Sequence, residues 1–183
     1  MSVTISAQIT PNPNTLKFVV NKLLLESGSI DFVNEVAAAD SPLPLALYQI
    51  KGVTGVLVGT NFVSVSKAIS IDWASLAEPI SDTLQSVLSG EGPFIKQELL
   101  TEKNQTPDTE IERRIKEIID TEIRPAVAMD GGDIIFQGFE DGIVSLSLQG
   151  ACSTCPSATL TLKMGIENRL KEEFPEIREV VQI

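Results

Sequence analysis

The chain has 183 residues, of which 43% are apolar and 21% charged, a balance typical of a folded globular protein and too hydrophobic for a disordered one. Its formal charge of −11 repels phosphate backbones and anionic lipid headgroups, so we expect no nucleic acid and no membrane among its partners. The sequence has no histidine and only two cysteines, Cys152 and Cys155, which excludes imidazole-based catalysis and imidazole-based metal sites.

Two hairpins are predicted in the first half of the chain. Four short segments are predicted as strands: apolar and polar residues alternate in the first two, as they do in half-buried strands, and the other two flank a turn signal. The turn-rich segment Pro11–Asn14 separates the first two segments, and Gly59–Asn61, whose glycine and asparagine tolerate positive φ, separates the other two. The expected strands cover residues 3–9, 16–20, 53–58 and 62–66.

Two helices complete this half. Ser41 followed by Pro42 is typical of a helix start and predicts a short helix, capped by Ser41, through about residue 50. Asp72 is expected to cap a second helix that ends at Gly90, with Trp73 as a core anchor. The apolar positions of this second helix recur at spacings of three and four: Trp73, Leu76, Ile80, Leu84 and Val87.

A polar, non-periodic stretch over residues 98–107 has the composition of an interdomain linker. We therefore predict an N-terminal domain over residues 1–97 and a C-terminal domain over residues 108–183. The acidic excess is uneven: six basic and ten acidic residues give −4 before residue 106, whereas eight basic and fifteen acidic residues give −7 after it.

The second half is predicted to be an α-β-β-α-β unit. A helix that starts at Thr106-Pro107 should present an isoleucine face and be closed by Pro125 and then Asp130–Asp133, and a second helix should run from Ser157 to Pro175. Both halves are therefore expected to be small α+β domains, with helices covering one face of a short sheet. Strands are expected over 134–139, 143–148 and 177–183, and the helix faces comprise Ile111, Ile115, Ile118 and Ile123, then Ala158, Leu162, Ile166 and Leu170.

The compartment is predicted from the absence of targeting patterns. The first ten residues carry no Lys or Arg, and no apolar run approaches the roughly 18 to 20 residues of a membrane span. We therefore expect a cytoplasmic protein, and closely spaced thiols in that compartment more often bind metals or act in redox chemistry than form structural disulfides.

The motif Cys-Ser-Thr-Cys-Pro, residues 152–156, is the one pattern that carries chemistry. It lies between a strand end and a helix start, and Pro156 suits the first helical turn, which places Cys155 at or near the N-cap. The free N–H groups and the positive dipole end favour a thiolate there, so we expect the pKa of Cys155 to lie below the usual value of about 8.5.

Several interpretations of Cys152 and Cys155 remain open on the residues alone. A thioredoxin-like dithiol couple normally lies early in a βαβ unit, whereas this motif follows a hairpin late in its domain. Zinc needs four Cys or His ligands, which one chain lacks. An iron–sulfur cluster also takes four thiolates, which a two-fold dimer would supply. The remaining alternative is that the two cysteines have no chemical role and are simply two small hydrophobic residues buried three positions apart.

The second half closely resembles the C-terminal domain of NifU and the Nfu proteins. The resemblance rests on the segments 129–134 (MDGGDI), 148–157 (LQGACSTCPS) and 161–167 (TLKMGIE), followed by Pro175-Glu176. The first half resembles the Nfu-type N-terminal domain less specifically, through residues 11–18 (PNPNTLKF), Gly52-Val53 and Asp72-Trp73.

This resemblance implies a non-enzymatic iron–sulfur scaffold or carrier. Cys152 and Cys155 of each protomer would bind a [4Fe–4S] cluster across a homodimer, although four thiolates can equally hold a [2Fe–2S] core. The implied partners are upstream cluster-assembly proteins and recipient apoproteins, which we expect the N-terminal domain to select. The runner-up is a monomeric thiol–disulfide redox module, and a pure interaction module with incidental cysteines is the third class.

Other residues are weaker candidates. The segment Asp130–Asp133 would either hold a divalent cation or, as we expect, form a helix-to-strand turn whose glycines supply positive φ. Gly150 is expected to let the backbone bend close to the sulfurs, and Gly165 to permit helix packing. The carboxylates along Glu167–Glu179 are interpreted as a solvated face.

Overall fold

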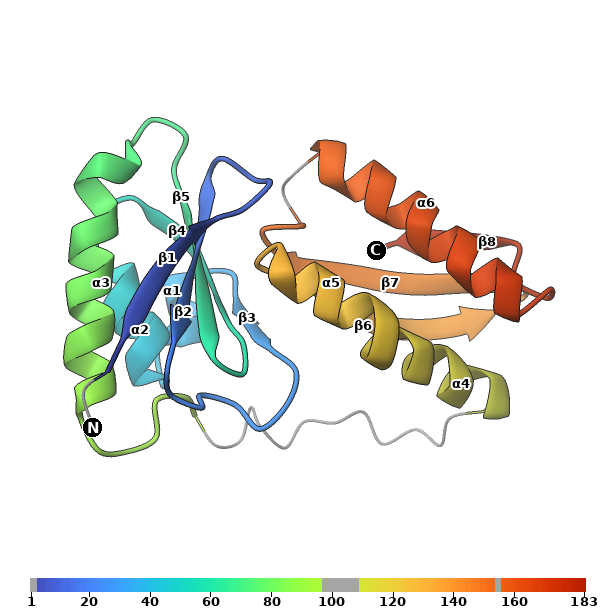
Figure 1. Ribbon diagram of the computed structural model, residues 1–183, viewed down its shortest axis with the longest axis horizontal. Helices are drawn as coiled ribbons and strands as arrows, with labels where there is room; N and C mark the ends of the chain where they lie inside the picture. Colours follow the sequence, from blue (N-terminus) through green and yellow to red (C-terminus); the bar gives the residue numbers. More distant parts are fainter. Residues whose placement is uncertain (1–2, 97–108, 154–155) are drawn as a thin grey trace. The chain divides into compact units, whose positions relative to one another are not determined.

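The computed structural model describes residues 3–96, 109–153 and 156–183, of which 156–159 are described by their backbone alone (Figure 1). The chain divides into two compact units, Met1–Lys103 and Asn104–Ile183, and each is considered by itself. The predicted linker, residues 98–107, lies outside the described residues, as does Cys155. The mixed α and β composition of both units confirms the predicted fold class.

The first unit is a five-stranded antiparallel sheet with helices packed on it. Both predicted hairpins are confirmed, because β1 pairs with β2 and β4 pairs with β5, and the strand order is β1-β2-β5-β4-β3. The strands are β1 (Ile5–Ile9), β2 (Thr15–Val20), β3 (Ile30–Phe32), β4 (Val53–Val58) and β5 (Phe62–Lys67), and the helices are α1 (Glu35–Ala38), α2 (Pro42–Tyr48) and α3 (Trp73–Ser89).

Helices α2 and α3 lie side by side against the sheet (Figure 1). Asp72 caps α3 through its side chain and Gly90 ends it, as predicted. The stripe of α3 that faces the core ends one residue later than expected, because Leu88 is fully buried and Val87 only partly. Trp73 packs against the same core and donates from its indole N–H to the Pro13 carbonyl at 2.9 Å, which is the expected anchoring role.

Two local expectations in this unit were wrong. Ser41 precedes α2, but its hydroxyl makes no capping bond to that helix; it accepts the backbone N–H of Lys96 at 3.0 Å instead. Gly59 does not adopt positive φ; a Cβ at this position would lie 2.3 Å from the Phe62 ring, so the turn needs a glycine for space.

The second unit has the predicted order α-β-β-α-β, with a π-helical turn inside its first helical segment. Strand β7 is the centre of a three-stranded sheet in which β6 is antiparallel and β8 parallel to it. The elements are α4 (Glu110–Ile118), η2 (Ile119–Ile123), α5 (Arg124–Met129), β6 (Gly132–Glu140), β7 (Ile143–Gly150), α6 (Pro156–Glu173) and β8 (Glu179–Gln182).

The first helical segment is described from Thr109 and ends at the predicted Asp130–Asp133 turn. The observed N-cap is Thr109, which forms a reciprocal capping box with Glu112, and the expected start at Thr106-Pro107 lies outside the described residues. Pro125 does not close the helix, which continues to Met129 and ends at the second predicted stop signal, Asp130–Asp133. The π turn η2 ends two residues before Pro125, which cannot donate the usual backbone hydrogen bond, so the chain widens by one residue and then resumes the α-helix.

Asp141 and Gly142 form the turn between β6 and β7. Asp141 and Gly142 adopt φ of 51° and 82°, the conformation that an Asp-Gly pair favours in a two-residue hairpin turn.

Helix α6 and the α4–α5 segment lie side by side on one face of this sheet (Figure 1), joined by an ion pair of 2.7 Å between Arg169 and Glu122. Their inward side chains and those of the sheet form one hydrophobic core, in which Ile115, Ile134 and Leu170 are fully buried. Among the described residues, no helix is both long and apolar enough to cross a membrane.

Candidate functional site around Cys152

Cys152 lies just after the central strand of the second sheet. Strand β7 ends at Gly150, whose φ of 63° turns the chain inward, as expected for this glycine. Ala151 and Cys152 are therefore buried, with Cys152 only 3% exposed, and Ser153 returns to the surface. Cys152 belongs to the hydrophobic core of the unit, so its thiol is shielded rather than presented on an open loop.

Local hydrogen bonds hold residues 150–153 in place. The backbone N–H of Ser153 donates to the Gly150 carbonyl at 3.2 Å, and the Ser153 hydroxyl donates to the same oxygen at 2.8 Å. The N–H of Ala151 donates to the Gly131 carbonyl at 3.2 Å. The cysteine segment is thus tied to the turn that precedes β6, about twenty residues earlier in the sequence.

The turn Asp130–Asp133 forms the other wall of the site. Gly131 adopts φ of 78°, which is the predicted helix-to-strand turn role, whereas Gly132 does not have positive φ. A Cβ added to Gly132 would lie 2.6 Å from Sγ of Cys152 and 2.8 Å from the Gln149 carbonyl oxygen. The bare backbone of Gly132 therefore makes room for the sulfur.

The acidic residues of this turn are not arranged as a cation site. Asp133 is buried, and its Oδ1 accepts the N–H of Ile134 at 2.7 Å and lies 3.1 Å from Nε of Arg124. Asp130 is exposed at the surface. No group of three or more Cys, Asp or Glu side chains in the described ranges is placed to hold a metal ion.

Two further expectations are revised. Gly165 is not required for helix packing, because a Cβ there would meet nothing within 4 Å. Glu167 is more than part of a solvated face, since it accepts the N–H of Val180 at 3.0 Å and pairs with Lys171. The hydrogen bonds from Lys171 and Val180 hold the pKa of the Glu167 carboxyl below its ordinary value.

The outward face of α6 carries two exposed apolar side chains. Leu160 and Met164 are 63% and 58% exposed, and their four-residue spacing places them on the same side of the helix. Ile166 and Leu170 mark the opposite, inward side. Sequence analysis did not single out Leu160 and Met164, although both are large apolar residues outside the predicted stripe.

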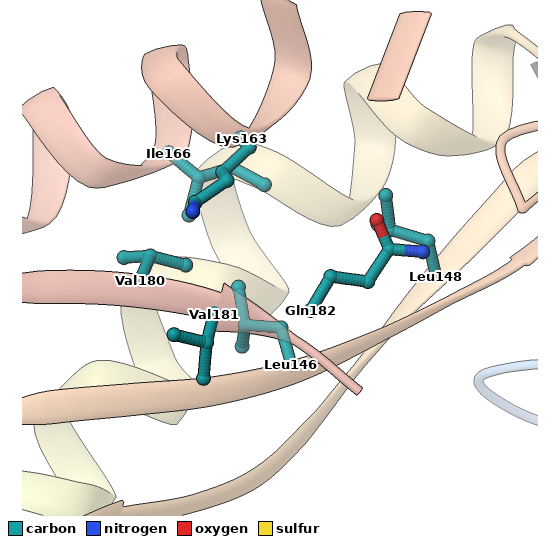
Figure 2. A pocket seen from close by; sticks show the side chains of 7 residues that line it. All are labelled: Leu146, Leu148, Lys163, Ile166, Val180, Val181 and Gln182. Carbon is teal, nitrogen blue, oxygen red and sulfur yellow. The ribbon is translucent and has the colours of Figure 1, made fainter. Parts of the chain in front are cut away.

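A small pocket lies between α6, β7 and β8 (Figure 2). Its walls are apolar apart from Lys163 and Gln182, and Lys163 also pairs with Glu179 at 3.5 Å. It offers no convergent set of polar groups of the kind that orients a small ligand. The remaining lining residues are Leu146, Leu148, Ile166, Val180 and Val181.

Two family models match the chain. The model described as "NifU-like domain" matches residues 115–181, and the model described as "Scaffold protein Nfu/NifU N terminal" matches residues 5–91. One match thus falls within each compact unit.

Curated relatives match nearly the whole chain. A human protein named "NFU1 iron-sulfur cluster scaffold homolog, mitochondrial" is 44% identical over 98% of this chain and 71% of its own length. A NifU-like protein of Schizosaccharomyces pombe is 38% identical, with 100% and 73% covered. "NifU-like protein 4, mitochondrial" of Arabidopsis thaliana is 42% identical, with 97% and 65% covered. A solution structure of a NifU-like protein from Saccharomyces cerevisiae is 28% identical over 52% of this chain and 86% of its own, with a TM-score of 0.47.

These names contradict the expected cytoplasmic location, because the human and Arabidopsis relatives are named as mitochondrial proteins. Cellular addresses are encoded in separate targeting segments rather than in the composition of a folded domain. The lack of a targeting pattern in the first ten residues was therefore the wrong evidence for a compartment.

Proposed function

This chain belongs to the Nfu family of NifU-like iron–sulfur cluster scaffold proteins, and on that premise we propose that it carries a [4Fe–4S] cluster between two copies of itself. Cys152 and Cys155 of each copy are the proposed ligands. The cluster is cargo, received from upstream assembly proteins and passed to recipient apoproteins. The names of the relatives point to mitochondria as the compartment.

The count of thiols carries this proposal. An iron–sulfur cluster is usually held by four thiolates, and one chain has two cysteines and no histidine. Two copies related by a two-fold axis bring the same segment together and supply four. A site shared in this way opens when the copies separate, which suits a protein that gives its cluster away.

The surface near the cysteines supports a weak dimer rather than a permanent one. Leu160 and Met164 lie within the first half of α6, five and nine residues after Cys155 in the sequence, and offer apolar area to a second copy. The area that these two side chains can bury falls far short of the roughly 800 Å² that each partner buries in a standard interface. The net charge of −7 after residue 106 opposes association further. The cluster itself would then be the main link between the copies.

Burial of Cys152 adds a requirement to loading. Cys152 is 3% exposed, so its sulfur does not reach an iron shared with another chain. The segment 150–153 must therefore move Sγ outward before the cluster binds, breaking the short hydrogen bonds that Ser153 makes to Gly150.

Anaerobic reconstitution with iron and sulfide tests the proposal on the full chain. We expect about two irons and two sulfides per chain in a dimer, measured by metal analysis and light scattering. Cys152→Ser and Cys155→Ser should each abolish uptake, and Gly165→Ala, which meets no neighbour, should not.

Two other outcomes would contradict the proposal in different ways. One iron per chain in a dimer indicates a [2Fe–2S] core instead. No iron uptake by a folded, reduced monomer that cycles between dithiol and disulfide favours the redox module.

We also propose the domain limits 1–97 and 108–183, with residues 98–107 as linker and the N-terminal domain as the part that selects recipients. The two compact units and the separate family matches support this division. Limited proteolysis of the full chain should cut first within residues 98–107 and leave two resistant fragments. First cleavage inside either proposed domain would contradict the limits.

A further inference from the structure

Gly132 is the first residue of β6 and pairs with Gly150 of β7 in the antiparallel register. Its nearest neighbours across the missing side chain are Sγ and Cβ of Cys152 and the carbonyl oxygen of Gln149, at 2.6, 3.0 and 2.8 Å from an ideal Cβ. Real Cβ atoms do not approach heavy atoms this closely. Any residue other than glycine would therefore have to displace the sulfur, the carbonyl or both.

Two observations show that the need for glycine is specific to position 132 and is set neither by its backbone conformation nor by the strand as a whole. Its φ lies outside the positive region, so backbone conformation does not require glycine there. Gly138 lies in the same strand, and a Cβ there would meet nothing within 4 Å. The requirement at position 132 thus concerns the space taken up by Cys152 and by the Gln149 carbonyl.

We propose that Gly132 is a positioning residue for Cys152, whose thiol occupies the space that a side chain at position 132 would fill. In this position the thiol is held against the core and shielded from solvent, and it returns there when the cysteine segment closes. The consequence for cluster loading rests on the proposed function, whereas the consequence for thiol shielding does not.

Thiol alkylation tests the positioning directly. In a Cys155→Ser background the chain has one thiol, and its reaction rate with iodoacetamide reports the exposure of Cys152. Gly132→Ala should raise this rate by about tenfold or more, because the added methyl group drives the sulfur out of the core, whereas Gly138→Ala should leave it within about twofold. An unchanged rate in a folded Gly132→Ala variant would overturn the proposal.

A double-mutant cycle covers the case in which Gly132→Ala is too unstable for that assay. Melting temperatures are measured for the unaltered chain, for Gly132→Ala, for Cys152→Ala and for the double variant, so that the loss caused by Gly132→Ala is known with cysteine and with alanine at position 152. If the sulfur is the main obstacle, Cys152→Ala recovers a large part of the loss. An equal loss in both backgrounds, or failure of both to fold, would mean that the Gln149 carbonyl sets the requirement, and the proposal would be wrong.

Reconstitution separates this proposal from the proposed function. With both cysteines present, Gly132→Ala should bind less iron per chain than Gly138→Ala under the same conditions. If the unaltered chain takes up no iron, the cluster function fails while the alkylation result still decides the positioning. If all variants load equally although alkylation differs, Gly132 shields the thiol without affecting loading, and the loading consequence is refuted.

Discussion

The carboxylate of Asp133 lies 3.1 Å from Nε of Arg124, an ion pair that links the start of β6 to the start of α5. Asp133 is 5% exposed, and the same guanidinium donates to the Ile134 carbonyl at 3.0 Å and lies 3.2 Å from Asp120. Arg124 therefore fastens the end of the π turn to the strand that carries Gly132. The ion pair therefore holds the Asp130–Asp133 turn, which forms one wall of the cysteine site.

Asp133→Asn should destabilise the protein by about 2 kcal/mol, because it leaves the charge of Arg124 without its most buried partner. The variant keeps an oxygen for the Ile134 N–H, so the loss reports the charge. Urea unfolding measures it. Glu110→Gln is the matched control, since Glu110 and Arg113 pair in full exposure and should contribute nothing measurable. Equal effects of the two variants would contradict a role for the buried pair.

Met164→Glu should weaken the cluster-loaded dimer. A carboxylate on the outward face of α6 adds like charge to a unit that is already acidic and removes apolar area from the proposed contact. Light scattering on a dilution series should show dissociation at about tenfold higher protein concentration. Val36→Glu changes a still more exposed apolar residue of the first unit and should have no effect. Unchanged dissociation in Met164→Glu would place the contact elsewhere.

The stability supplied by Glu167 should depend on pH. Its folded pKa lies below the ordinary value of 4.5, chiefly because Lys171 donates to it and also because the Val180 N–H does. Such a carboxylate stabilises the fold above its unfolded pKa and loses this effect as the pH falls through its folded pKa. Glu167→Gln should therefore melt below the unaltered protein at pH 7, and the difference should close in acid.

Glu172→Gln is the control for that pH series, because Glu172 lies exposed on the same helix. Its melting curve should follow the unaltered protein throughout. A constant difference for Glu167→Gln across the pH range would show that shape rather than charge is responsible.

Gly59→Ala should destabilise the first unit by about 1 to 3 kcal/mol, because the new methyl group would lie 2.3 Å from the Phe62 ring. Gly55→Ala is the matched variant in the same hairpin, where the methyl group would sit at an ordinary 3.5 Å from Ser66. Thermal unfolding should separate the two. Similar melting temperatures would show that the Phe62 ring moves aside without cost.

Local patterns predicted the elements whose signal is local. Alternation located the first hairpin, the turn residues Gly59–Asn61 located the second, and the spacing of Leu76, Ile80 and Leu84 located α3. These features depend on residues within one or two turns of each other. The order of strands within each sheet leaves no such mark, because alternation shows which face is buried but not which neighbour is paired.

The interactions that define the candidate site were not predictable in the same way. Gly132 meets Cys152 and Arg124 meets Asp133 only because the hairpin and the π turn bring them together, and their separations follow no helical or strand period. Ser41 was expected to cap α2, yet its hydroxyl accepts a hydrogen bond from the backbone N–H of Lys96, 55 residues later in the chain. The proposed ligands Cys152 and Cys155 were named from the sequence, whereas the surroundings of Cys152 required the fold.

Strand β8 is parallel to β7 and reaches it only after the whole of α6 has been made. On the ribosome, the first unit is complete long before this, while the second unit still lacks one side of its core. Cys152 emerges ahead of β8, at a stage when Val180, a member of the same hydrophobic core, is not yet in place. Burial of the Cys152 side chain in that core therefore waits for the last strand, and the speed at which β8 joins the sheet sets how long this thiol stays uncovered.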